Sequence, residues 1–144
     1  MKRKYLPTIS ELIDRMFICQ LKAIFIYEHK EDYEKEIQDI MHDLNLEMKK
    51  VKIKDQGNFL RAVGVLMLTN RFIWENESKA RQGGSDQDKL LKLTHSINGV
   101  RNNAKNIISQ ALGERKDLKL DCLAAEFIKD KGYGDWRIWT NEKE

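Results

Sequence analysis

Hydrophobic residues recur every three or four positions along most of the chain, the spacing that places side chains on one face of a helix. The first such run extends from Ile9 to Phe25, and Thr8 with Glu11 gives it a capping-box start. We therefore expect an all-α fold, a single-domain bundle of four to five helices over residues 1–144. The pattern predicts helices over about 9–27, 32–48, 58–81, 86–112 and 120–129, and an irregular aromatic tail over 132–144.

Turn-forming residues separate these helices. Gly83 and Gly84 lie in a short QGGS break, so the third and fourth helices are expected to form a central antiparallel hairpin. Asp55 or Asn58 is a candidate N-cap for the third helix. Gly113 is a natural stop for the fourth, because glycine tolerates the left-handed conformation.

Two helical stripes in this hairpin carry polar side chains where core residues usually stand. In an antiparallel hairpin, residues equidistant from the turn face each other. Asn70 is then expected near Asn98, Trp74 near His95, and Glu77 near Leu91. The first stripe consists of Leu60, Val63, Met67, Asn70, Trp74, Glu77 and Arg81, and the second of Leu91, His95, Asn98, Asn102 and Lys105.

This polar seam has two interpretations. In the first it is a hydrogen-bonded network that fixes helix register, as a buried asparagine does in coiled coils. In the second it is a pocket in which basic side chains bind an anion, Trp74 stacks on a ring, and asparagines read amide, sugar or base edges. A nucleotide-like or sugar-phosphate-like ligand would satisfy those groups. The candidate ligand-binding residues are Asn70, Trp74, Glu77, Arg81, His95, Asn98, Arg101, Asn102 and Lys105.

Composition narrows the class of protein. A chain of 144 residues with 41% hydrophobic and 34% charged residues fits one helical globular domain. The net charge of +3 describes a mixed surface, so nucleic acid is not an expected partner. No apolar run approaches the ~20 residues that cross a membrane, and no signal-peptide pattern opens the chain. We expect a cytoplasmic protein without a membrane partner, in which Cys19 and Cys122 are free, buried thiols.

Motifs for catalysis are weak. His42-Asp43 is an HD dipeptide on the polar side of its helix, with no clearly matching distal acid to complete the metal site of a phosphohydrolase. Glu31 and Glu34 have ExxE spacing, but no well-placed ExxD partner follows on another helix. A phosphate-binding glycine loop and a serine or cysteine nucleophile motif are absent. The expectation is a protein with no metal, no cofactor and no catalytic residue.

Two motifs resemble uncharacterised helical domains of bacteria and their phages. The opening Thr8-Ile9-Ser10-Glu11-Leu12-Ile13-Asp14-Arg15 is similar to the T-I-x-E-L-I-D-R start of such domains. The later Asn70-x3-Trp74-x2-Glu77-x3-Arg81, followed by Ile97-Asn98-x2-Arg101-Asn102, is similar as well. The resemblance touches about half of the chain, implies a helical bundle and brings no established activity. By analogy it suggests a phage accessory protein, in a bacterial cell or a phage-infected host.

Three functional hypotheses follow. The first is a non-enzymatic protein, encoded by a phage, that binds or sequesters an anionic nucleotide-like ligand in a polar pocket between helices. The alternative is a helical protein–protein interaction module that uses the aromatic tail. The third is a small hydrolase or transferase with Glu77 and His95 as acid and base. A homo-oligomer would cover the apolar excess at Ile24, Phe25 and Ile26.

Overall fold

A computed structural model describes residues 3–115 of the chain, and in that part it contains helices and no strand. The all-α bundle is therefore confirmed for these residues. The expected fifth helix over 120–129, the aromatic tail over 132–144 and Cys122 lie outside the described residues. The four helices are α1 (Ile9–Phe25), α2 (Lys30–Met48), α3 (Gln56–Arg81) and α4 (Gln87–Ala111).

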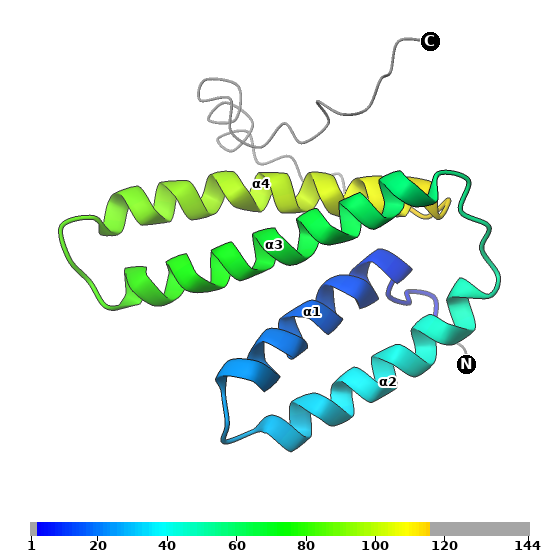
Figure 1. Ribbon diagram of the computed structural model, residues 1–144, viewed down its shortest axis with the longest axis horizontal. Coiled ribbons are helices and arrows are strands. Elements are labelled where there is room, and N and C mark those ends of the chain that lie inside the picture. The colour runs from blue at the N-terminus through cyan, green and yellow to red at the C-terminus, as the bar shows by residue number, and fades with distance from the viewer. Residues whose placement is uncertain (1–2, 116–144) are drawn as a thin grey trace, which may run out of the picture.

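The four helices form two hairpins of unequal length (Figure 1). The longer one pairs α3 with α4, which confirms the expected antiparallel hairpin, and the shorter one pairs α1 with α2. α1 lies between α2 and the long hairpin, and it contacts all three other helices. It crosses the hairpin obliquely, so the half of α3 and α4 nearest their connecting turn projects beyond α1 (Figure 1).

Helix boundaries follow local signals. The Thr8 hydroxyl accepts a bond from the Glu11 amide, and the Glu11 side chain returns one to the Thr8 amide, which confirms the capping box. Asp55 is the N-cap of α3, with Oδ1 2.9 Å from the Asn58 nitrogen. The turn glycines adopt positive φ, +78° at Gly83, +125° at Gly84 and +69° at Gly113, which side-chain-bearing residues rarely do.

Three boundaries differ by two residues from the sequence-based ones, and one of them is the start of α3, which begins at Gln56 and not at 58. α1 ends at Phe25 and not near 27, because Ile26 turns to an extended conformation with φ −119° and ψ 100°. α2 begins two residues early, at Lys30 and not at 32. Glu31 and Asp32 then lie in its first turn, where acidic side chains interact favourably with the helix dipole. A charged segment that looks like a break is therefore a helix start.

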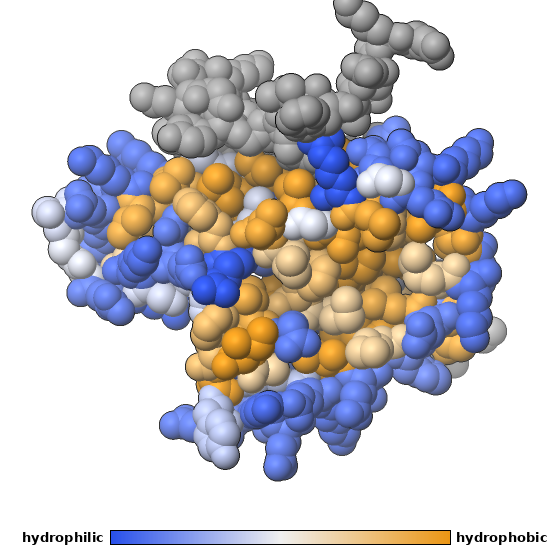
Figure 2. Space-filling model, viewed as in Figure 1, coloured by the Kyte–Doolittle hydropathy of each residue, from blue (hydrophilic) through white to orange (hydrophobic). Residues whose placement is uncertain are grey.

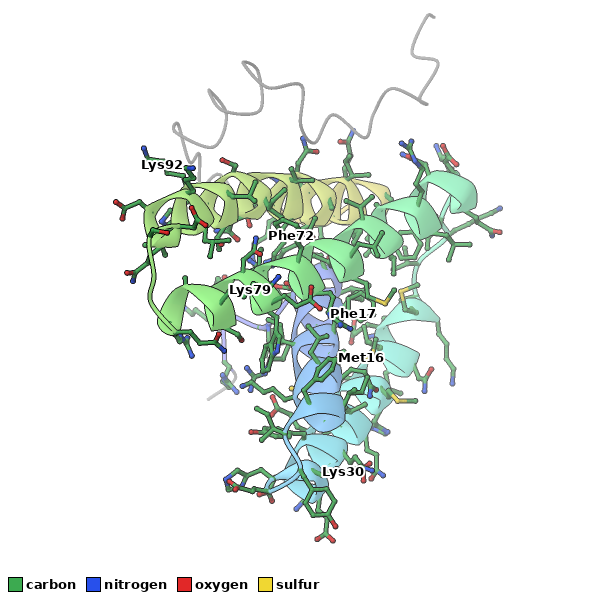
Figure 3. All side chains as sticks on the ribbon, turned by 60° about the vertical axis from the view of Figure 1, so that its left-hand side comes forward. Met16, Phe17, Lys30, Phe72, Lys79 and Lys92 are labelled. Atoms are coloured by element: carbon green, nitrogen blue, oxygen red, sulfur yellow. The ribbon has the colours of Figure 1, made fainter. Side chains whose placement is uncertain are left out.

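The core divides into two clusters joined by α1. The larger cluster is built from α1, α3 and α4, and the smaller one from Cys19, Ala23 and Ile37 between α1 and α2. Phe17 packs against the larger cluster and Met16 against the smaller one, so adjacent positions of α1 serve both hairpins (Figure 3). The larger cluster consists of Ile9, Ile13, Phe59, Ala62, Leu66, Ala104, Ile108 and Leu112.

The end of α4 closes the start of α1. After the left-handed turn at Gly113, the Glu114 carboxylate accepts bonds from the Ile9 amide at 2.6 Å and the Ser10 amide at 3.3 Å. These are free N–H groups of the first turn, and the helix dipole favours an anion there. The hydroxyls of Ser10 and Ser109, 2.7 Å apart and buried, connect the same two helices.

Hydrophobic side chains are also abundant on the surface. Figure 2 shows them across the middle of one face, over α1 and α3. Among the described residues no helix is both long and apolar enough to span a bilayer. The most exposed of the large apolar side chains on these two helices are Ile24, Phe25, Leu60, Met67 and Leu68.

Glu114→Ala should lower the free energy of unfolding by about 1–2 kcal/mol, because it leaves two amides of the first turn of α1 without their anionic acceptor. Urea denaturation at pH 7 measures this loss. Gln110→Ala, at an exposed position of α4, is the matched control. Equal stability of the two variants would contradict the capping role.

An ion pair ties α1 to α2 at the surface. Arg15 donates to the Glu36 carboxylate, and this bond holds the pKa of Glu36 below its ordinary value of 4.5. The same bond raises the pKa of Arg15. Burial raises the pKa of the neighbouring Cys19 thiol, which is therefore neutral at pH 7. Because the Glu36 side chain is 39% exposed, solvent screens the pair.

Stability should depend on pH through Glu36. A carboxylate with a lowered pKa in the folded state stabilises the fold above its ordinary value of 4.5, and the contribution is lost as the pH falls through the folded-state pKa. Glu36→Gln should therefore cost less than about 1 kcal/mol at pH 7 and nothing once the carboxylate is protonated. Thermal melts of both proteins between neutral and acid pH test this. A difference between the two melting temperatures that grows as the pH falls would contradict this prediction.

Candidate functional site

The Asp14 carboxylate is the centre of a buried polar cluster where α1, α3 and α4 meet. Asn70 of α3 donates to Asp14 Oδ1 at 2.8 Å, and Arg101 Nε of α4 lies 3.3 Å from the same oxygen. A terminal nitrogen of Arg101 donates to Asp14 Oδ2, which completes a two-pronged contact. Lys105 Nζ lies 3.6 Å from Asp14 Oδ2. The three helices are thus joined through one side chain.

Helix geometry explains how the cluster assembles. At 100° per residue, Asp14 falls between Leu21 and Phe25 on the wheel of α1, inside the apolar arc that faces the hairpin. Arg101 and Lys105 are four residues apart, so both side chains lie on one face of α4. Asn98 completes that face by accepting a bond from Arg101 at 3.1 Å.

The cluster is enclosed but has unequal charges. The exposed fraction of the side chain is 8% for Asp14, 19% for Arg101 and 15% for Lys105. One carboxylate therefore faces two cations. Two nitrogens of the Arg101 guanidinium and the side-chain amide of Asn70 already donate to Asp14. This arrangement matches the interpretation of the polar seam as a hydrogen-bonded network. Asn70, Asn98, Arg101 and Lys105 are the four predicted site residues that it gathers.

The other predicted residues lie elsewhere. Glu77 and Arg81 are exposed and form a loose ion pair with a nitrogen–oxygen distance of 4.0 Å. His95 is exposed on α4, and Asn102 is half-buried on the same helix. Trp74 lines a separate pocket. The structure thus divides the nine candidates and does not bring them into one site.

The proposed stripe along α3 is also offset from its buried face. Leu60 is 67% exposed and Met67 48% exposed. Leu66 and Thr69 point inward instead, together with small residues such as Ala62. Small side chains let α3 approach α4 closely, so part of the inward face is not strongly hydrophobic. The stripe overlaps the buried face at Val63 and Asn70 and departs from it at Leu60 and Met67.

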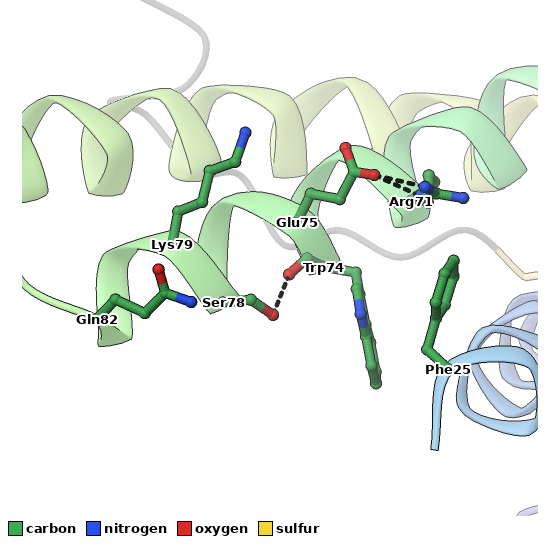
Figure 4. Close-up of a pocket in the computed structure, with 7 residues that line it drawn as sticks. All are labelled: Phe25, Arg71, Trp74, Glu75, Ser78, Lys79 and Gln82. Atoms are coloured by element: carbon green, nitrogen blue, oxygen red, sulfur yellow. Dashed lines mark hydrogen bonds and ion pairs between the residues drawn. The ribbon is translucent and has the colours of Figure 1, made fainter. Parts of the chain in front are cut away.

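The pocket at Trp74 is a wedge-shaped space of about 360 Å³ between the C-terminal end of α1 and the second half of α3 (Figure 4). It forms because α1 diverges from the hairpin. Figure 4 shows the indole of Trp74 and the ring of Phe25 extending into the same space from the two helices. Its volume falls at the lower end of the range of small-molecule sites. The lining residues are Phe25, Arg71, Trp74, Glu75, Ser78, Lys79 and Gln82.

The wedge has one unbalanced positive charge. Arg71 and Glu75 form an ion pair with nitrogen–oxygen distances of 2.7 and 2.6 Å. The Arg71 guanidinium also lies 4.7 Å from the centre of the Phe25 ring. Lys79 also lines the space, but its side chain extends from α3 in the direction opposite to the Trp74 indole (Figure 4), and it forms no ion pair with a described residue. Ser78 donates its hydroxyl proton to the Trp74 carbonyl at 2.9 Å.

Sequence reasoning missed Asp14, Phe25, Arg71 and Lys79. Asp14 carried a usable signal, because a carboxylate inside an apolar arc needs a partner. No signal in the sequence marked Phe25 or Arg71, because their roles depend on the angle at which α1 crosses α3.

Groups suited to catalysis do not converge in the described part. Within residues 3–115, no three His, Cys, Asp or Glu side chains are placed to hold a metal ion. Glu77 and His95 are both exposed, so neither has the enclosed environment that tunes an acid–base pair.

No protein-family model matches the chain, and no curated protein or solved structure is significantly similar to it.

Asp14→Asn should lower the free energy of unfolding by about 3 kcal/mol, because Arg101 and Lys105 lose their counter-charge in an enclosed site. Urea denaturation at pH 7 measures the loss, and Asp43→Asn, at an exposed position of α2, is the matched control. Combining Asp14→Asn with Arg101→Met should cost less than the sum of the two single changes. Strict additivity would show that the two side chains are not coupled.

Proposed function

We propose that this protein is a non-enzymatic binding protein for a small anionic, nucleotide-like ligand, and that the ligand occupies the wedge between α1 and α3. The observation that carries the proposal is the pair of aromatic side chains, Trp74 and Phe25, that extend into one pocket whose lining includes Lys79, a lysine without an ion pair to a described residue. Held tightly, such a ligand would be sequestered without any reaction. A phage accessory protein could act in this way, as the resemblance of the opening and hairpin motifs suggests.

The aromatic walls supply the energy for a planar ring. A base that enters between an indole and a phenyl ring is stacked on both faces, and each base–aromatic contact is worth about 1–3 kcal/mol. Trp74 lies within α3 and Phe25 is the last residue of α1, so both rings are carried by helices and not by loops. The predicted stacking role of Trp74 is retained, with Phe25 as a second platform that the seam did not include.

The rim supplies the preference for an anion. Lys79 and Arg71 are the cations of the wedge, and Glu75 balances Arg71. A phosphate or carboxylate on the ligand would pair with Lys79 and share Arg71 with Glu75. The amide of Gln82 and the hydroxyl of Ser78 are available for polar edges of the ring.

Thermal-shift measurements on the full chain with nucleotides, cyclic nucleotides and nucleotide sugars test the proposal. Ligand at one hundred times its dissociation constant stabilises a protein by about 2.7 kcal/mol, which raises Tm by roughly 5–10 °C for a domain of this size. Trp74→Ala and Lys79→Gln should each weaken binding at least tenfold, because one removes a stacking wall and the other a positive charge of the pocket lining.

Two control variants separate binding in the wedge from binding at another surface of the protein. Lys92→Gln removes an equal charge from the exposed surface of α4, away from the wedge, and should leave binding unchanged (Figure 3). Trp74→Phe should recover part of the affinity, since a ring remains. A ligand whose affinity survives both Trp74→Ala and Lys79→Gln would place the site elsewhere.

A protein–protein interaction module is the second candidate, and the exposed apolar side chains of α1 and α3 favour it. Ile24 is 63% exposed and Leu68 65% exposed. If no ligand in the screen raises the melting temperature of the unmodified protein, this candidate is favoured over the first.

A further inference from the structure

The outward face of α3 carries a row of large apolar side chains that no other described residue covers. Leu60, Leu68 and Phe72 belong to one ridge of residues four apart, and Met67 adjoins it. Their exposed fractions are 67% for Leu60, 65% for Leu68, 48% for Met67 and 37% for Phe72. Exposed apolar rows of this kind commonly mark contact surfaces.

Gly64 lies in the middle of the ridge. A Cβ added there would meet no atom within 4 Å, so the packing of this chain does not require glycine. Its φ is not in the positive range, so the backbone does not require it either. Glycine inside a helix costs about 0.5–1 kcal/mol relative to alanine. A second helix that packs closely over Gly64 would account for it.

We infer that two copies of this chain associate through α3, antiparallel, about a two-fold axis that passes Gly64. Leu60 and Leu68 stand four residues before and four residues after that glycine. In an antiparallel pair centred there, Leu60 of each copy lies opposite Leu68 of the other. A two-fold interface needs a surface that is complementary to itself, and this spacing provides one.

The surface also has the area and charges for such a contact. The four apolar side chains expose on the order of 400 Å² per copy. About 800 Å² from two copies, at the roughly 60% apolar fraction of typical interfaces, corresponds to about 1,300 Å² in total, the lower end of stable complexes. In the same register, Arg71 of one copy approaches Asp55 of the other, and Glu75 approaches Lys54.

Sedimentation equilibrium of the full chain from about 1 to about 500 μM tests the association. The unmodified protein should form a dimer, and Leu68→Glu should weaken it at least tenfold while circular dichroism shows the same helix content. Met41→Glu places the same charge on an apolar side chain of α2 that is 49% exposed, and it should leave the dimer intact.

Gly64→Ala should have opposite effects on the stability of the monomer and on the affinity of the dimer. Alanine should raise the Tm of the dilute monomer by about 2 °C, because it favours helix in open space. The same change should weaken the dimer, because the added methyl groups meet at the axis. A protein that stays monomeric throughout the range, or a dimer that Leu68→Glu leaves intact, overturns the inference; a different protein bound at this face would account for the first outcome.

Discussion

The fold depends on neutralising one carboxylate, that of Asp14. A buried anion is costly unless donors surround it, so Asn70, Arg101 and Lys105 from two other helices must converge on the same point of α1. The apolar contacts of the larger core cluster would tolerate several placements of α1. The carboxylate does not, because its hydrogen bonds have direction. The carboxylate therefore sets where α1 crosses the hairpin. Replacing the polar cluster by apolar residues would remove this preference for one crossing position before it lowered the stability of the fold.

The wedge is a consequence of that crossing. α1 is fixed to the hairpin near its start, by Glu114 and Ser109 at its first turn and by Asp14 one turn later. Beyond these contacts α1 diverges from the hairpin toward α2. Its last residue, Phe25, therefore lies far enough from α3 to leave room for a ring between them. The wedge adjoins the outward face of α3, and Arg71 and Glu75 belong both to the wedge and to the proposed contact between copies, so a ligand and a second copy would compete for these side chains.

The helices, their caps and the hairpin could be predicted from the sequence because they depend on local pattern, as at Thr8, Asp55 and Gly113. The site could be predicted only in part. Asn70, Asn98, Arg101 and Lys105 do gather, but around an aspartate from a third helix, and no pattern within one helix shows which neighbour it meets. The α3 stripe failed for a different reason: interhelical packing selects small residues such as Ala62, whereas a search for hydrophobicity selects Leu60.

Among the described residues, each helix in the projecting half of the α3–α4 hairpin has only the other as a neighbour, and the buried side chains between them are small or polar. Ala80, Thr94 and Asn76 are buried there, and the amide nitrogen of Asn76 has no hydrogen-bond partner among the described residues. Little apolar area is therefore lost when this half separates, whereas opening the other half would expose Leu66 and Ile108. Opening the hairpin near Gly83 is therefore expected to cost less free energy than opening it beside Asp14, and amide hydrogens near Gly83 should exchange faster than those beside Asp14.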